Sequence, residues 1–362
     1  MMSESGNVVK DQNLDGAYER LHQSGPEWGG NMANHAPMAA EVMARRDRAD
    51  EIPGWIDAYA PRLMEAPAPS EPITDATWQA ALGDRVGDWC VYLTWQMRER
   101  PWREVLATWW PRLLPGITAG ATHGTIRTGH AVRTLLAIES ESGESGESAP
   151  ALDELAHGLA YWAARFRGVP GVATPAGTLD AAHALDAVPR IDQQEGPIRI
   201  RLGMLGELRG WPESVTALRP AIEPEQVRDR LTEVVDAATL RYLTHGHAGP
   251  TLLVHTATAP NAILHTLPAL PREQWAASLT VAWAASAAIT SMYGPSEALP
   301  RSDLPTAPRG NDPAAEVLDR AFAHGDEHVI KFTDTAVEVY ARTGDPDALA
   351  AAVHATALFE RQ

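Results

Sequence analysis

Apolar residues recur at steps of three and four along most of the chain, the spacing of one face of an α-helix. The clearest run lies in 74–98 and contains Trp78, Leu82, Val86, Trp89, Leu93 and Met97. Strand-type alternation is almost absent; the exception, 198–202, indicates a short strand or an extended connection. The pattern therefore predicts an all-α protein, a compact multi-helix fold with few or no strands.

Helix-start and helix-stop residues bound several of the predicted helices. Pro37 and Pro224 suit a first helical turn, and Asp312 followed by Pro313 is a typical start. Gly344 after Thr343 is a typical stop. Helices are expected over 36–44, 55–63, 74–98, from 101, over 151–166, 224–243 and 272–292, from 313, and over 346–359.

Composition along the chain predicts its organisation. Residues 1–14 are polar and are expected to be a disordered tail. The acidic Ser/Gly run within 139–150 has nothing to bury, so we expect a flexible surface loop there. The remainder, 15–362, is predicted to be one helical domain, with two helical lobes divided near this loop as the alternative.

The charge balance excludes several partners. The chain has 30 Lys and Arg against 47 Asp and Glu, so its formal net charge is −17. Such a surface repels phosphate backbones and anionic lipids, so neither nucleic acid nor a membrane surface is an expected partner. There is no signal-peptide pattern and no run of roughly 18 apolar residues, and a cytoplasmic protein is expected.

Missing motifs exclude further classes. A single cysteine, Cys90, rules out thiolate metal sites and a disulfide framework. No glycine-rich dinucleotide or phosphate loop follows a strand, so the sequence does not support NADPH or FAD binding. No nucleophile-elbow motif of an α/β-hydrolase occurs. Chemistry in this chain must therefore come from histidines, carboxylates or lysine.

Lysine is nearly absent from this sequence. Of the 30 basic residues only Lys10 and Lys331 are lysines, and Lys331 lies in the apolar run around 329–332. An arginine cannot lose its proton in a protein, whereas a buried lysine can and then becomes a nucleophile. Lys331 is therefore a candidate for chemistry, and a retained surface lysine is the alternative.

Four of the 13 histidines lie in apolar segments rich in small residues: His35, His123, His255 and His328. Buried imidazoles need partners, and one metal ion provides a partner for several. Lys331 follows His328 by three positions, so both project from one helical face, and a neutral lysine adds CO₂ to give a carbamate oxygen ligand. Without thiolates, such a site suits iron, zinc, copper or manganese.

Two further polar residues follow His123 at helical spacing. His130 is seven residues on and Arg127 stands between them. His130 is a candidate metal ligand or substrate contact, and either residue could pair with a phenolate oxygen of a substrate.

The ordered segments around these residues resemble the questin oxidase-like family, helical proteins of aromatic polyketide pathways. The likeness covers about residue 15 to the end. It rests on Asn34-His35-Ala36-Pro37-Met38, Trp102-Arg103-Glu104-Val105-Leu106, the segment 120–133, His255-Thr256-Ala257-Thr258-Ala259-Pro260, and Asp326-Glu327-His328-Val329-Ile330-Lys331-Phe332-Thr333.

This resemblance implies an oxygenase that uses O₂ to cleave or expand a ring of a polycyclic, anthraquinone-like substrate, by Baeyer–Villiger-type or carbon–carbon cleaving oxidation. It implies non-haem Fe(II) held by His35, His123, His255, His328 and carbamylated Lys331. The sequence departs from the family pattern at Arg127, where histidine is frequent, and at His130, where tyrosine is. Arg127 and His130 are accordingly the candidate catalytic, substrate-facing residues.

Two other functions compete with this interpretation. One is a helical binding protein for a pathway intermediate, in which the histidines are hydrogen-bonded core residues. The other is a cofactor-free oxidase, in which Lys331 or His130 acts as the base on a phenol. A binding protein would tolerate Lys331→Arg, and a cofactor-free oxidase would turn over after chelation.

Overall fold

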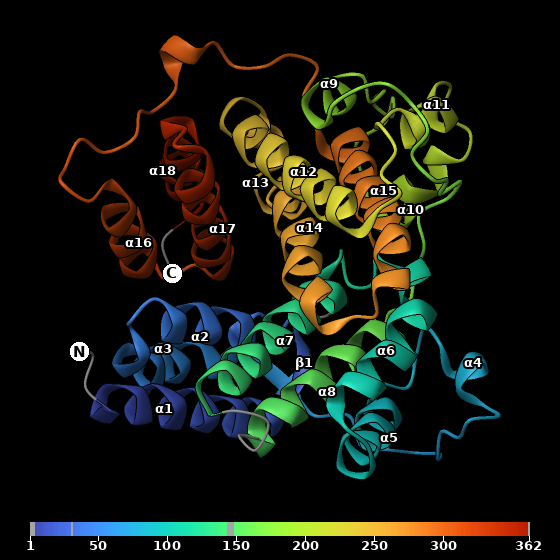
Figure 1. The fold of residues 1–362 in the computed structure, drawn as a ribbon, viewed down its shortest axis with the longest axis vertical. Helices are drawn as coiled ribbons and strands as arrows, with labels where there is room; N and C mark the ends of the chain where they lie inside the picture. The colour runs from blue at the N-terminus through green and yellow to red at the C-terminus, as the bar shows by residue number, and fades with distance from the viewer. Residues whose placement is uncertain (1–3, 30–31, 143–147, 361–362) are drawn as a thin grey trace. The chain divides into compact units, whose positions relative to one another are not determined.

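Helices make up most of the chain, which confirms the predicted all-α class (Figure 1). The structure, a computed structural model, describes residues 4–29, 32–142 and 148–360, and side chains from residue 12 onward. The described chain divides into two compact units. Unit 1 is Met1–Gly168 with Pro268–Leu270, and unit 2 is Val169–Leu267 with Pro271–Gln362.

Unit 1 is a helical assembly with a small sheet. Its strands β1 (Ser24–Trp28), β2 (Met32–Ala33) and β3 (Leu63–Glu65) are antiparallel in the order β2-β1-β3, with Glu27 opposite Ala33. Its helices are α1 (Glu4–His22), α2 (Ala36–Arg45), α3 (Ile52–Tyr59), α4 (Trp78–Ala81), α5 (Val86–Glu99), α6 (Trp102–Leu113), α7 (His123–Ser142) and α8 (Ala149–Ala164).

Tryptophans form the core of unit 1. Trp89 and Trp109 meet edge to face with their ring centroids 5.4 Å apart, and Trp110 meets Trp162 in the same way at 5.3 Å. These indoles are buried, and the indole N–H of Trp89 donates to the Ala81 carbonyl at 3.0 Å. Around this core α8 packs against both α5 and α7.

Unit 2 contains helices only, apart from connecting segments. They are α9 (Ala181–Asp186), α10 (Ile198–Leu205), α11 (Trp211–Thr216), α12 (Pro224–His245), α13 (Pro250–Leu253), α14 (His255–Thr266), α15 (Trp275–Tyr293), α16 (Pro313–His324), α17 (Glu327–Thr343) and α18 (Pro346–Leu358). Helices α12, α14 and α15 pack against one another, as Figure 1 shows.

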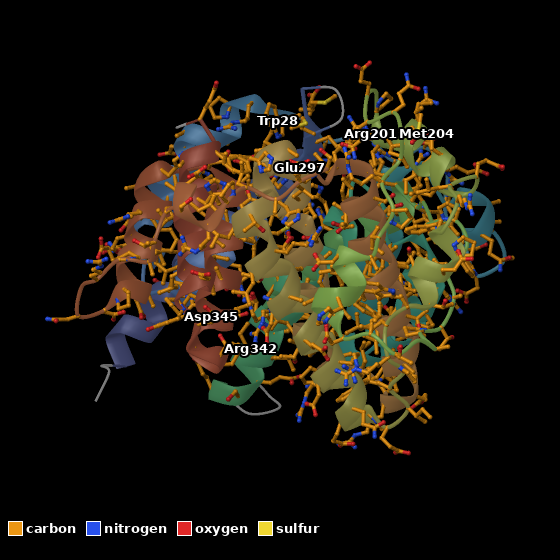
Figure 2. The ribbon with its side chains drawn as sticks, turned by 90° about the horizontal axis from the view of Figure 1, so that it is seen from above. Trp28, Arg201, Met204, Glu297, Arg342 and Asp345 are labelled. Carbon is orange, nitrogen blue, oxygen red and sulfur yellow. The ribbon has the colours of Figure 1, made fainter. Side chains whose placement is uncertain are left out.

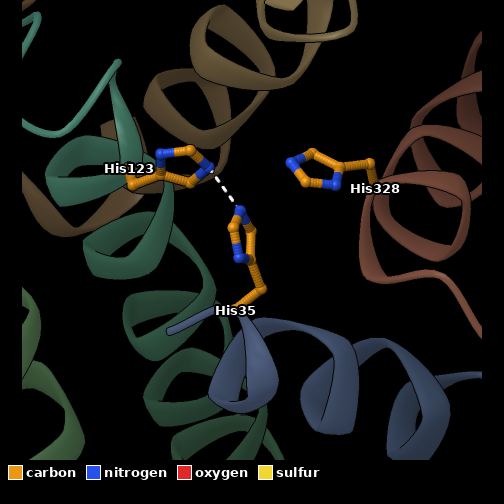
Figure 3. A group of neighbouring side chains, drawn as sticks. All are labelled: His35, His123 and His328. Carbon is orange, nitrogen blue, oxygen red and sulfur yellow. Dashed lines mark hydrogen bonds between the residues drawn. The ribbon is translucent and has the colours of Figure 1, made fainter. Parts of the chain in front are cut away.

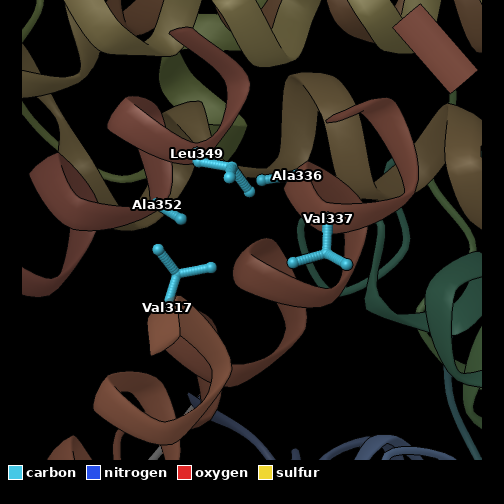
Figure 4. Close-up of a cluster of buried hydrophobic side chains, with 5 residues drawn as sticks. All are labelled: Val317, Ala336, Val337, Leu349 and Ala352. Atoms are coloured by element: carbon cyan, nitrogen blue, oxygen red, sulfur yellow. The ribbon is translucent and has the colours of Figure 1, made fainter. Parts of the chain in front are cut away.

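Three C-terminal helices of unit 2 share a small apolar core. Val317 of α16, Ala336 and Val337 of α17, and Leu349 and Ala352 of α18 converge there (Figure 4). The helices start and stop where the sequence predicts, because Asp312 caps α16 and Gly344, at φ 71°, ends α17. This packing fixes α17, which carries His328 and Lys331.

The segment 198–202 is helical, so the expectation of a strand or extended connection is wrong. Arg199 and Ile200 are both exposed, so the alternation does not mark a buried face, whereas Leu202 and Leu205 are the buried residues of α10. Arg201, labelled in Figure 2, lies with its guanidinium 4.3 Å from the centre of the Tyr293 ring and donates to the Met292 carbonyl at 3.0 Å. These contacts fix α10 against the end of α15.

The predicted tail and loop also have different bounds in the structure. Helix α1 begins at Glu4, so residues 4–14 of the predicted disordered tail are helical; residues 1–3 lie outside the described part. Helix α7 continues to Ser142 and α8 begins at Ala149, so only 143–147 of the predicted loop lie outside the described residues. The boundary between the two units falls at Gly168, not at the acidic run.

The described helices include none that combines the length and the apolar character needed to cross a bilayer.

Candidate metal-binding residues

His35 lies at the start of α2, where local capping fixes the backbone. The Asn34 side-chain oxygen accepts the Ala36 N–H at 3.0 Å, and the His35 N–H donates to the Tyr59 hydroxyl at 3.0 Å. Pro37 occupies the first turn of the helix, as its sequence position predicts. The buried His35 imidazole therefore projects from a rigid helix end.

His123 follows three consecutive residues in the left-handed backbone region. Gly120, Ala121 and Thr122 have φ values of 52°, 57° and 74°. Such a conformation costs a non-glycine residue of the order of 1–3 kcal/mol, and a β-branched threonine is an unusual occupant. The turn brings the Gly120 carbonyl to His123 Nδ1, which donates a hydrogen bond to it.

His35 and His123 form a pair within unit 1 (Figure 3). Their Nε2 atoms are 2.6 Å apart and the two rings are nearly perpendicular, at 88°. Because His123 Nδ1 carries the proton that goes to Gly120, the Nε2 atom of neutral His123 presents a lone pair. A carbonyl that fixes the tautomer in this way is the usual partner of a metal-binding histidine.

His328 lies in the first turn of α17 in unit 2. Gly325, at φ 85°, ends α16, and the Asp326 carboxylate then caps α17 by accepting the backbone N–H groups of His328 at 2.8 Å and Val329 at 3.2 Å. Burial alone would raise the Asp326 pKa. The neighbouring His328 and the two backbone hydrogen bonds lower the pKa by more than burial raises it, so it lies below its ordinary value. Asp326 is therefore an anion beside His328.

The start of α17 is a group that could hold a metal ion. Nitrogen and oxygen atoms of Asp326, Glu327 and His328 lie within 4.8 Å of one another, and all three residues are buried. The Asp326 carboxylate is 3.5 Å from His328 Nδ1, so it can orient that ring. Figure 3 also draws His328, which is one of the four imidazoles predicted as metal ligands.

Lys331 lies one turn beyond His328 on α17 and is 3% exposed. Its ammonium nitrogen has no hydrogen-bond partner among the described residues. Burial lowers the Lys331 pKa to about 7, although Glu327 and Asp326 oppose this shift. A large fraction of the side chain is therefore a neutral amine at neutral pH, as the carbamate hypothesis requires.

His255 is the first residue of α14 and is also buried in unit 2. Its ring centroid lies 5.7 Å from that of His328, with the rings at 80°. Pro260 continues α14 although it cannot donate to the Thr256 carbonyl; the Ser286 hydroxyl donates there instead, at 2.8 Å. The Thr256 carbonyl in the helix that presents His255 thus keeps a hydrogen-bond partner despite the proline.

Arg127 and His130, the candidate substrate-facing residues, are both engaged in buried ion pairs of unit 1. Arg127 donates two hydrogen bonds to Glu154, at 2.5 and 2.7 Å. His130 Nδ1 lies 2.7 Å from a Glu41 oxygen, and Arg133 also binds this carboxylate. Both residues therefore have structural partners, and His130 in particular has a carboxylate to hold its proton.

Sequence reasoning missed Glu41 and Glu154. Glu41 lies in the apolar run 36–44, and Glu154, next to Asp153, lies in the mainly apolar run 151–164. A charge in such a run was the available signal that a buried counter-charge would be needed. Their pKa values respond accordingly: burial raises both, but Arg133 and His130 hold that of Glu41 far below its ordinary value, and Arg127 with His22 brings that of Glu154 to about 2.

Two comparisons with known proteins found no match: the chain matches no family model and no curated protein. The resemblance to the questin oxidase-like family stays a prediction. The structure itself shows that all the predicted ligands are buried; His35 and His123 belong to unit 1, and His255, His328 and Lys331 belong to unit 2.

These residues fit a metal ion. The observation that tests the fit is the buried amine of Lys331, which lacks a hydrogen-bond partner among the described residues in a segment that also buries an imidazole and two carboxylates. The donor set contains nitrogen and oxygen but no thiolate, which suits divalent first-row metals.

Proposed function

We propose that the protein is a metal-dependent oxygenase, with non-haem iron held by His35, His123, His255, His328 and a carbamate on Lys331. The proposal rests above all on Lys331, a buried lysine without a hydrogen-bond partner in the described chain, one helical turn from a buried histidine. An unpaired buried amine costs free energy, so its retention calls for a functional reason. The proposed substrate is a polycyclic aromatic compound.

When bound, ferrous iron would supply O₂ binding and electron transfer, which none of the side chains can provide alone. The chain's own contribution begins with Lys331, because its neutral amine can add CO₂ and release a proton to give an anionic carbamate. His123 contributes a lone pair at Nε2, since its Nδ1 proton is held by Gly120. Asp326 orients His328 in the same manner.

The remaining chemistry assigned to protein residues is substrate binding. In this proposal the Arg127 guanidinium donates a hydrogen bond to a phenolate oxygen of the substrate, and Glu154 fixes the plane of the guanidinium. His130, whose Nδ1 is held by Glu41, is the second candidate for a proton transfer with the substrate hydroxyl. The deep burial of the ligand groups keeps water away from them.

The test is elemental analysis of the protein after reconstitution with iron and bicarbonate, for the wild type and Lys331→Ala. Lys10→Ala is the matched control, because Lys10 is the only other lysine of the chain. We expect near-stoichiometric iron in the wild type and the control, and loss of most of it in Lys331→Ala.

Variants in each unit extend this test to the full ligand set. We expect His35→Ala and His328→Ala each to lose iron, as Lys331→Ala does. Iron retained in Lys331→Ala, or absent from the wild type, would overturn the proposal. Oxidation of a phenolic substrate by the chelated wild type would favour the cofactor-free oxidase.

A further inference from the structure

Unit 1 contains a cavity of about 200 Å³, and Arg127 is the one candidate site residue in its wall. It is lined by residues of α1, α5, α7 and α8 together with the segment around 66–69. Arg127 in its wall lies one helical turn after His123, and Asn34 in its wall directly precedes His35. Asn34 and Arg127 therefore connect the cavity wall to the chain segments that carry the two candidate ligands of unit 1, although neither ligand lines the cavity itself.

The polar wall of the cavity is electrically balanced. Glu154 binds the Nε and Nη2 groups of Arg127 and also lies 2.8 Å from His22 Nε2. One guanidinium and one carboxylate cancel, so the cavity does not select for a multiply charged ligand. The Nη1 group of Arg127 has no hydrogen-bond partner among the described residues, and it is left to donate to a ligand.

His157 is a further polar residue of the cavity wall. Its ring lies against that of His22, with centroids 4.2 Å apart, and it makes no hydrogen bond within the described part of the chain. Burial, with the charges of His22 and Arg127, lowers the His157 pKa to about 3. A neutral imidazole has one N–H donor and one acceptor nitrogen, and both lack partners here.

The remaining lining residues include the polar side chains of Ser24 and Asn34, and the others are mainly apolar. Cys90 adds a polarizable contact, since burial raises its thiol pKa to about 11 and keeps it from acting as a nucleophile. The apolar wall consists of Leu21, Pro26, Pro67, Pro69, Val86 and Val91. A fully apolar ligand would leave Arg127 Nη1 and His157 unsatisfied, and a cation would find no unpaired carboxylate among these lining residues.

We propose that this cavity binds the hydroxyl-bearing ring of a compact aromatic compound, with Arg127 Nη1 donating to the phenolic oxygen and His157 exchanging a hydrogen bond with the hydroxyl group. A phenol suits both partners because its oxygen accepts and its O–H donates, while its ring occupies the apolar wall. His157 is then the specificity-determining residue of the cavity. That the phenol is the substrate rests on the proposed function; that the cavity binds it does not.

The test is isothermal titration of the protein with naphthol and with naphthalene, which differ only in the hydroxyl group. We expect naphthol to bind at least about tenfold more tightly, the equivalent of one satisfied hydrogen bond. His157→Phe keeps the ring contact with His22 and should remove most of this preference. The exposed His183 provides the matched control, and His183→Phe should leave both affinities unchanged.

A second variant locates the binding. Cys90→Phe fills the cavity without touching Arg127 or His157 chemically, and it should abolish binding of both compounds while circular dichroism shows a folded protein. Naphthol binding that is absent from the wild type, or that survives both His157→Phe and Cys90→Phe unchanged, overturns the inference.

Titration of Lys331→Ala separates this inference from the proposed function. Naphthol binding by a variant that has lost its iron supports both. Naphthol binding by a Lys331→Ala protein that retains iron supports the cavity and contradicts the metal site, whereas loss of iron with no naphthol binding in the wild type contradicts the cavity alone.

Discussion

The two units present their candidate ligands in different ways. In unit 1 the backbone itself is strained, with Ala121 and Thr122 in the left-handed region directly before His123, and a carbonyl fixes the ring. In unit 2 the turn before His328 uses Gly325 for its left-handed position and an ordinary aspartate cap. The unfavourable contribution in unit 2 is instead the burial of the Lys331 amine without a hydrogen-bond partner among the described residues.

This contrast indicates that the two groups are stabilised by different interactions. Unit 1 offsets backbone strain with the buried ion pair of Arg127 and Glu154 one turn further along α7. In unit 2 no hydrogen bond offsets the free-energy cost of burying the Lys331 amine, because this amine has no hydrogen-bond partner among the described residues. Unit 1 is therefore expected to hold its geometry without an ion, and unit 2 to gain more stability from one.

The largest effect on stability is expected from breaking the buried ion pair of unit 1. Glu154→Gln leaves the Arg127 charge buried without its carboxylate and should lower the free energy of unfolding by about 3–5 kcal/mol. Urea unfolding at neutral pH measures this. Glu316→Gln, which removes the exposed partner of Arg320 in unit 2, is the control and should cost less than about 1 kcal/mol. Equal losses in the two variants would refute the assignment.

The same pair predicts how stability depends on pH. The Glu154 pKa is about 2 in the folded protein against an ordinary value of 4.5, because Arg127 and His22 outweigh the effect of burial. A carboxyl group whose pKa is lowered on folding stabilises the folded protein at pH values above its ordinary pKa of 4.5. That contribution is lost as the pH falls from 4.5 to about 2.

The loss corresponds to about 3 kcal/mol. Urea unfolding measured at intervals across this pH range should show the wild type and Glu154→Gln converging as the pH falls. Curves that stay parallel would show that the carboxylate of Glu154 has no special role in stability.

The smallest predicted effect compares the two turns directly. Thr122→Gly removes a strained backbone conformation and a buried hydroxyl without a partner in the described chain, and should raise the free energy of unfolding by about 1 kcal/mol. Gly325→Ala places a side chain at φ 85° in unit 2 and should lower it by about 1 kcal/mol. Thermal unfolding of both variants gives the signs, and a shared sign would contradict the contrast between the turns.

Much of the fold could be predicted because helix formation depends on local pattern. Asp312 and Gly344, predicted as a helix start and a helix stop, lie at helix ends in the structure, and the apolar steps of 74–98 form α4 and α5. The alternation over 198–202 gave a wrong prediction because five residues are too few to distinguish the strand period from the helix period. Only the burial of Leu202 and Leu205 decides for the helix.

The candidate site was predictable in its residue types but not in its partners. Histidines and a rare lysine in apolar segments indicate burial, and the structure confirms burial of His35, His123, His255, His328 and Lys331. The ion pairs of Arg127 with Glu154 and of His130 with Glu41 join residues 27 and 89 positions apart, so no local pattern reveals them.

The sequence by itself determined the helical class, most helix ends and the residues able to bind a metal, because period, capping and side-chain chemistry are local properties. Tertiary structure alone decided which charges are neutralised, which tautomer His123 adopts, that Lys331 lacks a hydrogen-bond partner in the described chain, and that a cavity lies beside Arg127 and His157. These features depend on burial and on contacts between distant segments, and an electrostatic or hydrogen-bonding cost exists only once water has been excluded.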